Sequence, residues 1–287
     1  MKRLNFALKQ LCQRNRDGSY ATQMARARIL SLIANQLPEL GFRHVAVTHL
    51  KPKHIEGLID RWQEERLAPA TIKNRMAVLR WWAEKINKQN VVAKSNSHYG
   101  IPERGYLNND SKVRSVSVQR LASVKDEHVR MSLRLQAAFG LRREEAIKFT
   151  PAIADQGELV VLKPSWTKGG RARVIPVLND AQRDVLKAAA RLVGRGSLIP
   201  PQRSYREQLR IYERHTANAG LSKLHGLRHA YAQRRYLELT GWAAPLAGGP
   251  AQAALSFVDR ERDEHARRIL SAELGHTRPR ITRLYVG

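Results

Sequence analysis

Apolar side chains recur at helical spacing in the first hundred residues of the chain. In segment 71–87 they return at intervals of four, three, four and three residues, at Ile72, Met76, Leu79, Ala83 and Ile86. This spacing places them on one face of an amphipathic helix. Two further helices are predicted at about 25–37, ending before Pro38, and at about 52–65, after an extended segment at 45–50. We therefore expect a helical N-terminal domain over residues 1–95.

The pattern changes after residue 95. Residues 96–116 are rich in Ser, Asn, Gly and Pro and have no sustained period, which predicts a linker. Segments 158–162 and 173–177 read as β-strands on either side of Gly169-Gly170, which is typical of a short hairpin. Helical patterns surround this hairpin at about 121–125, 128–139, 180–192, 205–219, 227–239 and 258–274. The second domain, 117–287, is therefore predicted to be mainly α with a small β-sheet, an α+β fold.

The charge of the chain indicates a polyanionic partner. The 287 residues include 51 Lys and Arg against 25 Asp and Glu, a net charge of +26. The excess is spread over both predicted domains, and nucleic acid is the usual partner of such a chain. Lys73 and Arg80 share one face of the helix at 71–87 and are predicted to contact a DNA duplex. A general bias towards soluble, charged surface is the competing interpretation.

Several classes of protein are excluded. Cys12 is the single cysteine, so neither an internal disulfide nor a cysteine zinc site is expected, and a reducing compartment fits. Lys9 interrupts the apolar N-terminal stretch, which removes a secretory signal, and the longest uncharged run, 239–258, contains two prolines and three glycines. We expect a soluble protein without a membrane partner, located in the cytoplasm with the nucleoid.

Four short segments of the second domain carry candidate chemistry. They are 140–145 (Gly-Leu-Arg-Arg-Glu-Glu), 167–173 (Thr-Lys-Gly-Gly-Arg-Ala-Arg), 225–229 (His-Gly-Leu-Arg-His), and 274–285, which begins Leu-Gly-His and ends at Tyr285. Each alone has an ordinary structural explanation. His225 and His229 are four residues apart like two zinc ligands, but Gly226 stands where a metalloprotease has Glu, so no metal site is expected.

Taken together and in this order, the four segments resemble the active site of the tyrosine recombinases, the phage-integrase type of site-specific recombinase. The resemblance covers about residues 115–287, and the first hundred residues are more weakly similar to the family's helical core-binding domain. It implies a two-domain DNA clamp. The matching active-site positions are Arg142, Lys168, His225, Arg228, His276 and Tyr285. Glu145 is expected to orient His225, and Arg171 and Arg173, beside the hairpin lysine, to contact DNA.

The chemistry of these residue types suits cleavage of a phosphodiester without a metal. Two arginines grip phosphate bidentately and keep their charge, which stabilises the charge of the transition state. The resemblance implies that Tyr285 attacks to form a 3′-phosphotyrosine, that His276 binds the phosphate, that His225 assists proton transfer and that Lys168 protonates the leaving 5′ oxygen. The intermediate keeps the energy of the bond, so neither a cofactor nor ATP is expected.

The resemblance also implies partners. Strand exchange between two duplexes requires four protomers, so we expect a homotetramer on double-stranded DNA with specific attachment-type sites, integrating or excising a mobile element. Accessory proteins that bend DNA or set the direction of the reaction are further expected partners.

Three other functions remain open at this point: a type IB topoisomerase, which uses the same chemistry, a non-catalytic DNA-binding protein on the same fold, and a metal-dependent transposase. Arg228 and His276 are 48 positions apart, which is about twice the spacing usual in the family. The sequence therefore predicts an insertion at 241–259, serving either as a partner-binding loop or as a simple excursion of the chain. The sequence ends two residues after Tyr285, where many relatives continue into a tail that packs on a neighbouring subunit.

Overall fold

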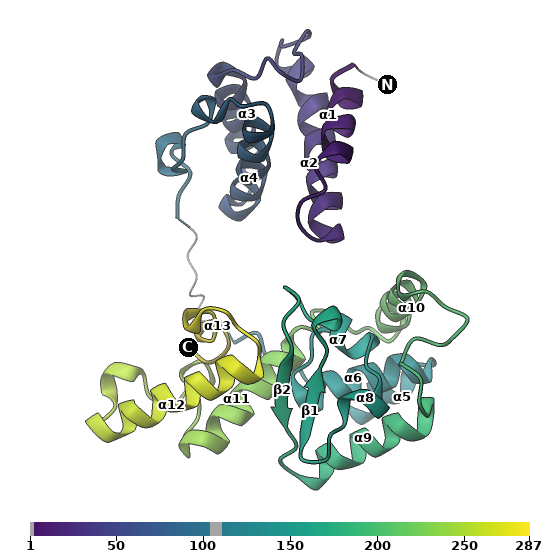
Figure 1. Ribbon diagram of the computed structural model, residues 1–287. Coiled ribbons are helices and arrows are strands. Elements are labelled where there is room, and N and C mark those ends of the chain that lie inside the picture. The colour runs from purple at the N-terminus through teal and green to yellow at the C-terminus, as the bar shows by residue number, and fades with distance from the viewer. Residues whose placement is uncertain (1–2, 104–110) are drawn as a thin grey trace. The chain divides into compact units, whose positions relative to one another are not determined.

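The computed structural model describes residues 3–103 and 111–287, which form two compact units, 1–105 and 106–287 (Figure 1). In the described part of the chain, no helix is both long enough and apolar enough to cross a bilayer.

The N-terminal unit is entirely helical in its described residues. Its elements are α1 (Arg3–Arg14), α2 (Tyr20–Glu39), α3 (Pro52–Glu64), α4 (Pro69–Lys85) and the short 3-10 turns η1 (Gln89–Val91) and η2 (Ser97–Tyr99). Pro52 and Pro69 stand in the first turns of α3 and α4, where a missing backbone N–H costs nothing. The apolar faces of α2, α3 and α4 meet in one core around the fully buried Trp62 and Trp82. The amphipathic spacing found in the sequence is therefore the packing face of α4.

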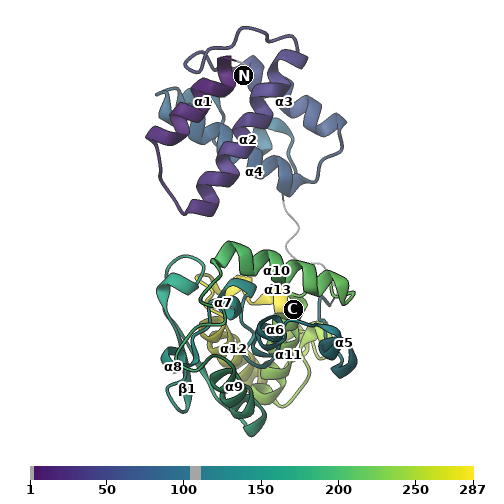
Figure 2. The same ribbon diagram turned by 90° about the vertical axis from the view of Figure 1, so that its right-hand side faces the viewer.

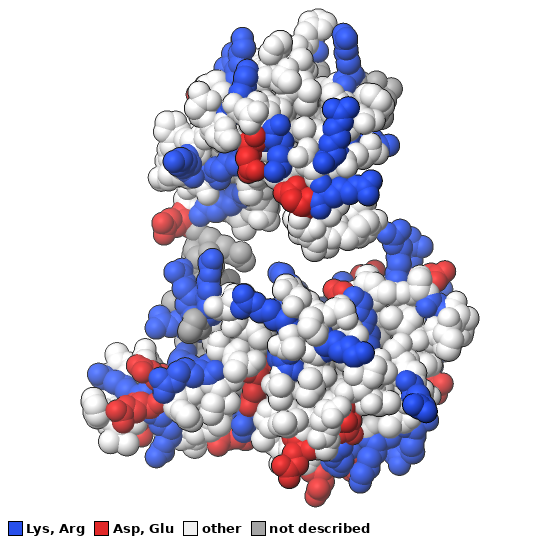
Figure 3. Space-filling model, in the orientation of Figure 1, with Lys and Arg blue, Asp and Glu red and all other residues white. Residues whose placement is uncertain are grey.

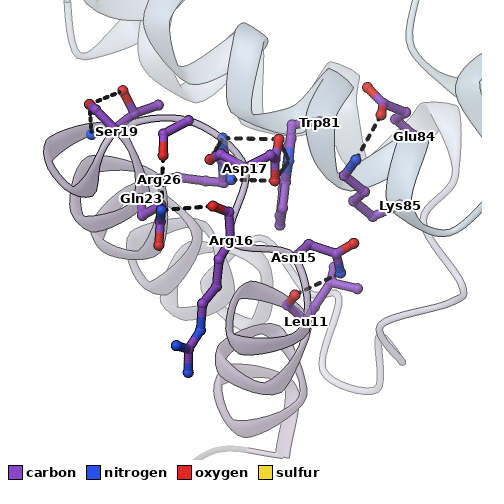
Figure 4. A network of polar contacts seen from close by, with 12 residues as sticks. Leu11, Asn15, Arg16, Asp17, Ser19, Gln23, Arg26, Trp81, Glu84 and Lys85 are labelled. Atoms are coloured by element: carbon purple, nitrogen blue, oxygen red, sulfur yellow. Dashed lines mark hydrogen bonds and ion pairs between the residues drawn. The ribbon is translucent and has the colours of Figure 1, made fainter. Parts of the chain in front are cut away.

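A polar network fixes the connection between α1 and α2 against α4 (Figure 4). Asp17 lies in that connection and accepts hydrogen bonds from the Trp81 indole at 3.0 Å and from Arg26 Nη1 at 3.1 Å. The Arg26 guanidinium also lies over the Trp81 ring, 4.2 Å from its centroid. One carboxylate thus joins three helices of the unit.

Three features of this unit differ from the sequence prediction. Helix α1 was not predicted, although Leu4 and Leu8 on its apolar face are buried. Helix α2 starts earlier than expected and runs through Pro38, which stands in its last turn, where the loss of one hydrogen bond is tolerated. Residues 45–50, predicted as an extended segment, include a turn at 47 and 48, and Val45, Val47 and Leu50 pack on the helical core.

The C-terminal unit is mainly helical around a two-stranded sheet, as predicted. The elements of this unit are α5 (Val118–Ser123), α6 (Glu127–Phe139), α7 (Arg143–Ile147), α8 (Pro151–Ala154), β1 (Leu159–Leu162), η3 (Pro164–Trp166), β2 (Arg173–Pro176), α9 (Asp180–Val193), α10 (Tyr205–Asn218), α11 (Gly226–Thr240), η4 (Pro245–Ala247), η5 (Gln252–Ala254), α12 (Phe257–Glu273), η6 (Pro279–Ile281) and α13 (Arg283–Val286). Helix α6 packs among α7, α9, α10 and α11 (Figure 2).

Strands β1 and β2 pair antiparallel, with Leu159 opposite Pro176 and Leu162 opposite Arg173. The register buries Val160, Leu162 and Ile175 in the main core of the unit. It also places Arg173 at the start of β2, next to the segment that connects the two strands.

The described parts of the predicted linker are packed on the two units. Ile101 is buried in the N-terminal core, and the backbone N–H of Arg114 donates to Gly226 O at 3.2 Å in the C-terminal unit. Residues 104–110, the middle of the predicted linker, lie outside the described residues.

Candidate active site

The first segment of the site is the tight turn between α6 and α7. Gly140 ends α6 in a left-handed conformation (φ +59°), and a Cβ there would lie 2.6 Å from the Tyr231 ring, so only glycine fits. Arg142 then precedes α7, and its backbone N–H donates to the Glu145 carboxylate at 2.6 Å. The turn therefore holds Arg142 and Glu145 in a fixed relation.

The C-terminal end of α12 provides the centre of the site. Gly275 has φ +60° and ends the helix, which leaves the Leu274 carbonyl without a helical partner. That oxygen accepts hydrogen bonds from three guanidiniums: Arg142 Nη2 at 3.2 Å, Arg173 Nη1 at 3.0 Å, and Arg228 Nη2. The negative end of a helix dipole favours such cations.

Arg228 is the most deeply buried of the three arginines. Its residue is 1% exposed, and its second nitrogen, Nη1, donates to Gly140 O at 2.5 Å. It stands in the first turn of α11, one turn after His225, and its guanidinium lies 5.8 Å from the centroid of the Tyr285 ring. Burial and the nearby Arg142 lower the pKa of Arg228.

Arg173 lies inside the protein, contrary to the expectation that it contacts DNA. The residue is 4% exposed and donates to Glu145 Oε2 at 2.5 Å as well as to Leu274 O. Glu145 is itself fully buried between Arg173 and Arg142, whose charges hold the pKa of this carboxyl below its usual value against the cost of burial. The β2 register turns Arg173 inward, where it pairs with this carboxylate; a buried charge left without a partner would be strongly destabilising.

Tyr285 lies beside this cluster of guanidiniums. It is 7% exposed, and its hydroxyl lies 3.0 Å from His225 Nε2. Its ring stacks on His229, with centroids 4.3 Å apart, and is 5.0 Å from the His276 ring. The predicted Arg142, His225, Arg228, His276 and Tyr285 are therefore brought together from three separate segments of the sequence.

Burial and neighbouring cations keep the three imidazoles neutral. Desolvation, followed by the charge of Arg228 and Arg142, lowers the pKa of His276 to about 3 and also lowers the pKa of His225. Desolvation and His225 lower the pKa of His229 to about 4. His276 Nδ1 pairs with the Thr282 hydroxyl at 3.0 Å, whereas its Nε2 is buried with no hydrogen-bond partner among the described residues. A neutral His225 has a ring nitrogen able to accept the Tyr285 proton.

These lowered pKa values predict acid sensitivity of the fold. In the unfolded chain a histidine protonates near pH 6.5, whereas folded His229 stays neutral to about pH 4. The free energy of unfolding should therefore decrease as the pH falls from 6.5 to 4, with His229 contributing on the order of 2 kcal/mol. Urea unfolding across this range should show a smaller decrease for His229→Phe, which keeps the ring stack. His265→Phe, on the exposed side of α12, is the control and should behave as the parent.

Two predicted residues lie apart from this cluster. Lys168 is exposed on the turn before β2, and no hydrogen bond or ion pair of the described residues joins it to the site. Arg171 is also exposed on this turn, with its backbone held by the Thr167 hydroxyl.

The two candidate DNA contacts in the N-terminal unit have different surroundings. Lys73 is half-buried on α4, and its side chain makes no hydrogen bond or ion pair with another described residue. Arg80, also half-buried, donates to Ala93 O at 3.0 Å and Asn96 Oδ1 at 2.8 Å, and desolvation lowers its pKa. Arg80 therefore ties the segment after α4 to that helix.

Three parts of the site were not in the predicted set: the Leu274 carbonyl, His229 and Thr282. The carbonyl has no side-chain signature, and His229 was considered only as a zinc ligand. Thr282 is fully buried and links His276 to the helix that carries Tyr285, which no spacing rule indicates. Within the described residues, no group of three or more His, Cys, Asp or Glu side chains is arranged to hold a metal ion. The arrangement thus offers cationic donors, a neutral base and a phenol.

Two family models match the chain. The family model "Phage integrase, N-terminal" matches residues 1–92, and the model "Integrase" matches residues 107–234. A search of curated proteins by sequence found no match.

Solved structures share the fold. The Tn1549 transposon integrase in complex with circular intermediate DNA is 12% identical, with a TM-score of 0.59 over 99% of this chain and 95% of that one. XerH site-specific recombinase bound to a palindromic difH substrate is 18% identical, with a TM-score of 0.61 over 99% and 81%. A lambda integrase dimer bound to a core site is 15% identical, with a TM-score of 0.61 over 99% and 95%.

Proposed function

Since this chain belongs to the phage-integrase family of tyrosine recombinases, we propose that it cuts and rejoins duplex DNA at specific sites through a bond between Tyr285 and a 3′ phosphate. One observation carries this assignment. The Tyr285 hydroxyl lies 3.0 Å from His225 Nε2, beside a buried cluster of guanidiniums. A tyrosine is a weak nucleophile until a base accepts its proton and a phosphate is polarised, and this site has groups for both.

The arginines bind the scissile phosphate in this proposal. Arg142 and Arg228 each place a planar fork at the end of α12, and Arg228 is fixed by two backbone carbonyls. When DNA binds, the non-bridging oxygens take hydrogen bonds from these forks, which stabilises the added charge of the transition state. His276 Nε2, buried and unpaired among the described protein groups, donates a further hydrogen bond to the phosphate.

Proton transfer is divided between two residues. Neutral His225 accepts the proton of Tyr285 as the phosphotyrosine bond forms. Lys168 gives a proton to the leaving 5′ oxygen. Its exposed turn contains Gly169 and Gly170, both at positive φ with open space around them, so the turn has freedom to bring Lys168 to bound DNA.

Double-stranded DNA is the partner that the surface favours. Lys and Arg side chains cover much more of the face in Figure 3 than Asp and Glu do, on both units. The solved relatives named above are DNA complexes of a transposon integrase, a Xer recombinase and a phage integrase. By extension we infer that this chain integrates or excises a mobile element as a tetramer on two DNA segments, in the cytoplasm with the nucleoid.

DNA binding should depend strongly on salt. Neutralising six to ten phosphates releases counterions, so affinity should fall on the order of 10³- to 10⁵-fold between 50 and 200 mM salt. Fluorescence anisotropy with a labelled duplex measures this slope, and a shorter duplex that offers fewer phosphates should give a shallower one. A flat titration would contradict a DNA-binding surface of this charge.

The function is tested on nicked duplexes that carry candidate attachment sites. A nick next to the scissile phosphate lets the 5′ fragment diffuse away, so the covalent complex accumulates and is detected on a denaturing gel. We expect the complex to form in excess chelator. Cleavage that requires magnesium and leaves no protein on DNA would identify a metal nuclease instead. Relaxation of any plasmid by the monomer would favour a topoisomerase, and binding without adduct on every duplex would indicate a non-catalytic DNA-binding protein.

A further inference from the structure

Helix α13, which carries Tyr285, is too short to fix its own position. It spans Arg283–Val286, a single turn, and an isolated helix of this length is not stable in water. The cleavage rate nevertheless depends on the position of the attacking oxygen relative to the phosphate, because a displacement of about 1 Å costs on the order of a hundredfold in rate. The position of the Tyr285 hydroxyl must therefore come from what packs around α13.

Helix α11 supplies one support. Gln233 Nε2 donates to the Tyr285 carbonyl at 3.1 Å, and the His229 ring stacks on the Tyr285 ring. Both contacts lie on one side of α13. They leave its C-terminal end to be held by another part of the chain.

The second support is the α11–α12 excursion, which we define as residues 241–256. It contains η4, and η4 packs directly on α13. A Cβ on Gly287 would lie 2.7 Å from Pro245 Cβ and 3.2 Å from Leu246 N, so the backbone after α13 lies against the excursion without a gap. Ala244 and Val286 are both fully buried in the same core.

The fold of the excursion is tightly closed on itself. The backbone N–H groups of Ala247 and Gly249 both donate to Ala244 O, at 2.7 and 3.0 Å. A Cβ on Gly249 would lie 1.7 Å from Ala243 O, so any side chain there would open the turn. A segment that served only to connect α11 and α12 would not need this closure.

Helix α12 also contacts the C-terminal end of α13. Arg267 donates through Nη1 to Gly287 O and through Nε to the buried Asp263 at 2.8 and 2.9 Å. Asp263 also accepts from the Tyr236 hydroxyl of α11 at 2.5 Å. Figure 1 shows α13 beside the layer of α11 and α12 that these contacts join.

We propose that the α11–α12 excursion is a brace that positions the Tyr285 nucleophile within its own protomer. The proposal rests on the proposed function, in which Tyr285 attacks the phosphate. The brace uses the buried face of the excursion around Pro245. Phe257 and Val258, 76% and 62% exposed just after it, take no part, although an excursion serving as a partner-binding loop would present such side chains.

Two variants weaken the brace without touching a residue of the site. Gly249→Ala forces the closed turn open, and Pro245→Gly removes the ring that Gly287 rests on. Gly194→Ala is the control for replacing a glycine, because a Cβ there meets nothing within 4 Å, and any effect of this variant comes from its positive φ (+57°), which Gly249 does not share. Phe257→Ser is the control for a partner surface.

Cleavage rate constants are measured at saturating nicked DNA from pH 6 to 10, together with DNA affinity and thermal midpoint. We expect both brace variants to cleave at least tenfold more slowly, with affinity within about twofold of the parent. Their rates should also rise further towards alkaline pH, because a displaced hydroxyl loses His225 as its acceptor. Simple loss of folded protein would lower the amount of adduct and leave the rate constant and the pH profile unchanged.

The proposal would be overturned if the brace variants cleaved at the parent rate with the parent pH profile. An equal loss of cleavage rate in Phe257→Ser would also overturn it, because the excursion would then act as a contact with another molecule. If Gly249→Ala does not fold, Pro245→Gly decides. Amide hydrogen exchange of residues 283–287 gives a readout that needs no cleavage. Exchange should speed up in Pro245→Gly but not in Gly194→Ala. If the parent forms no adduct, the proposed function fails, and this exchange measurement alone decides on the brace.

Discussion

Tyr285→Phe should abolish the covalent protein–DNA complex and recombination while leaving DNA affinity within about twofold of the parent. The substitution removes one oxygen and keeps the ring, which is 7% exposed and stacked on His229. It changes no charge on the basic surface. Because the deleted oxygen is the proposed attacking atom, no slower version of the same step remains. A denaturing gel with nicked DNA and an anisotropy titration measure the two quantities.

Tyr212→Phe is the matched control for this variant, because it also removes one buried hydroxyl, which bonds Gln136 outside the site and the brace, and it should leave adduct formation at the parent level. Tyr231 and Tyr236 are the nearest other candidates on the sequence, and both are buried on α11. Their hydroxyls donate to Glu273 at 2.8 Å and Asp263 at 2.5 Å. Burial and these carboxylates raise the pKa of Tyr231, and they raise that of Tyr236 to about 12. Neither phenol faces His225, so adduct formation by Tyr285→Phe would show that the nucleophile is assigned incorrectly.

Arg228→Lys should slow cleavage on the order of 10²- to 10³-fold, the range seen when a preorganised donor to a developing oxyanion is removed. Lysine keeps the charge but has a single nitrogen, so it cannot reach Gly140 O, Leu274 O and a phosphate in the geometry of the planar fork. Affinity should change much less, because the charge that attracts DNA lies mainly on the many exposed Lys and Arg side chains, whereas Arg228 is buried. Single-turnover cleavage at saturating DNA separates the two effects.

Arg234→Lys is the control on the same helix. Arg234 is about half exposed and pairs only loosely with Glu238, at 4.0 Å. Its replacement should leave the cleavage rate constant unchanged. Cleavage by Arg228→Lys at the parent rate would mean that the buried guanidinium shapes the fold and does not act on the phosphate.

Most of the long helices and the hairpin were predictable from the sequence, whereas α1 and the one-turn helices were not. The α4 segment was found because its apolar side chains repeat over several turns, and the β1–β2 hairpin because Gly169-Gly170 separates two short strands. Helices α7 and α13 span about one turn each, which is too little for a period to be visible. The start of α7 is set by a local contact of the Glu145 carboxylate with the Arg142 N–H, and the position of α13 depends on tertiary packing against η4.

The candidate site was predictable where spacing along the chain carries chemistry. The motifs at 140–145, 225–229 and 274–285 identified five side chains that the structure brings together. Arg173 was predicted to contact DNA because an arginine in a basic hairpin looks exposed. Its burial follows from the charge of Glu145, and the sequence does not show that these two residues meet. Arg80 was likewise predicted from its position on a basic face, while its hydrogen bonds to the following segment depend on how the chain turns back.

Three arginines converge on one main-chain oxygen, and this determines which positions of the chain should tolerate substitution. No side-chain replacement can delete the Leu274 carbonyl, so a mutational scan can detect its importance only through the residue that sets its direction. That residue is Gly275, whose φ of +60° disfavours side chains and whose added Cβ would lie 2.9 Å from Arg173 Cδ. A position without any functional group should therefore be as intolerant of change as the arginines themselves, and a redesign of DNA specificity has to leave it untouched.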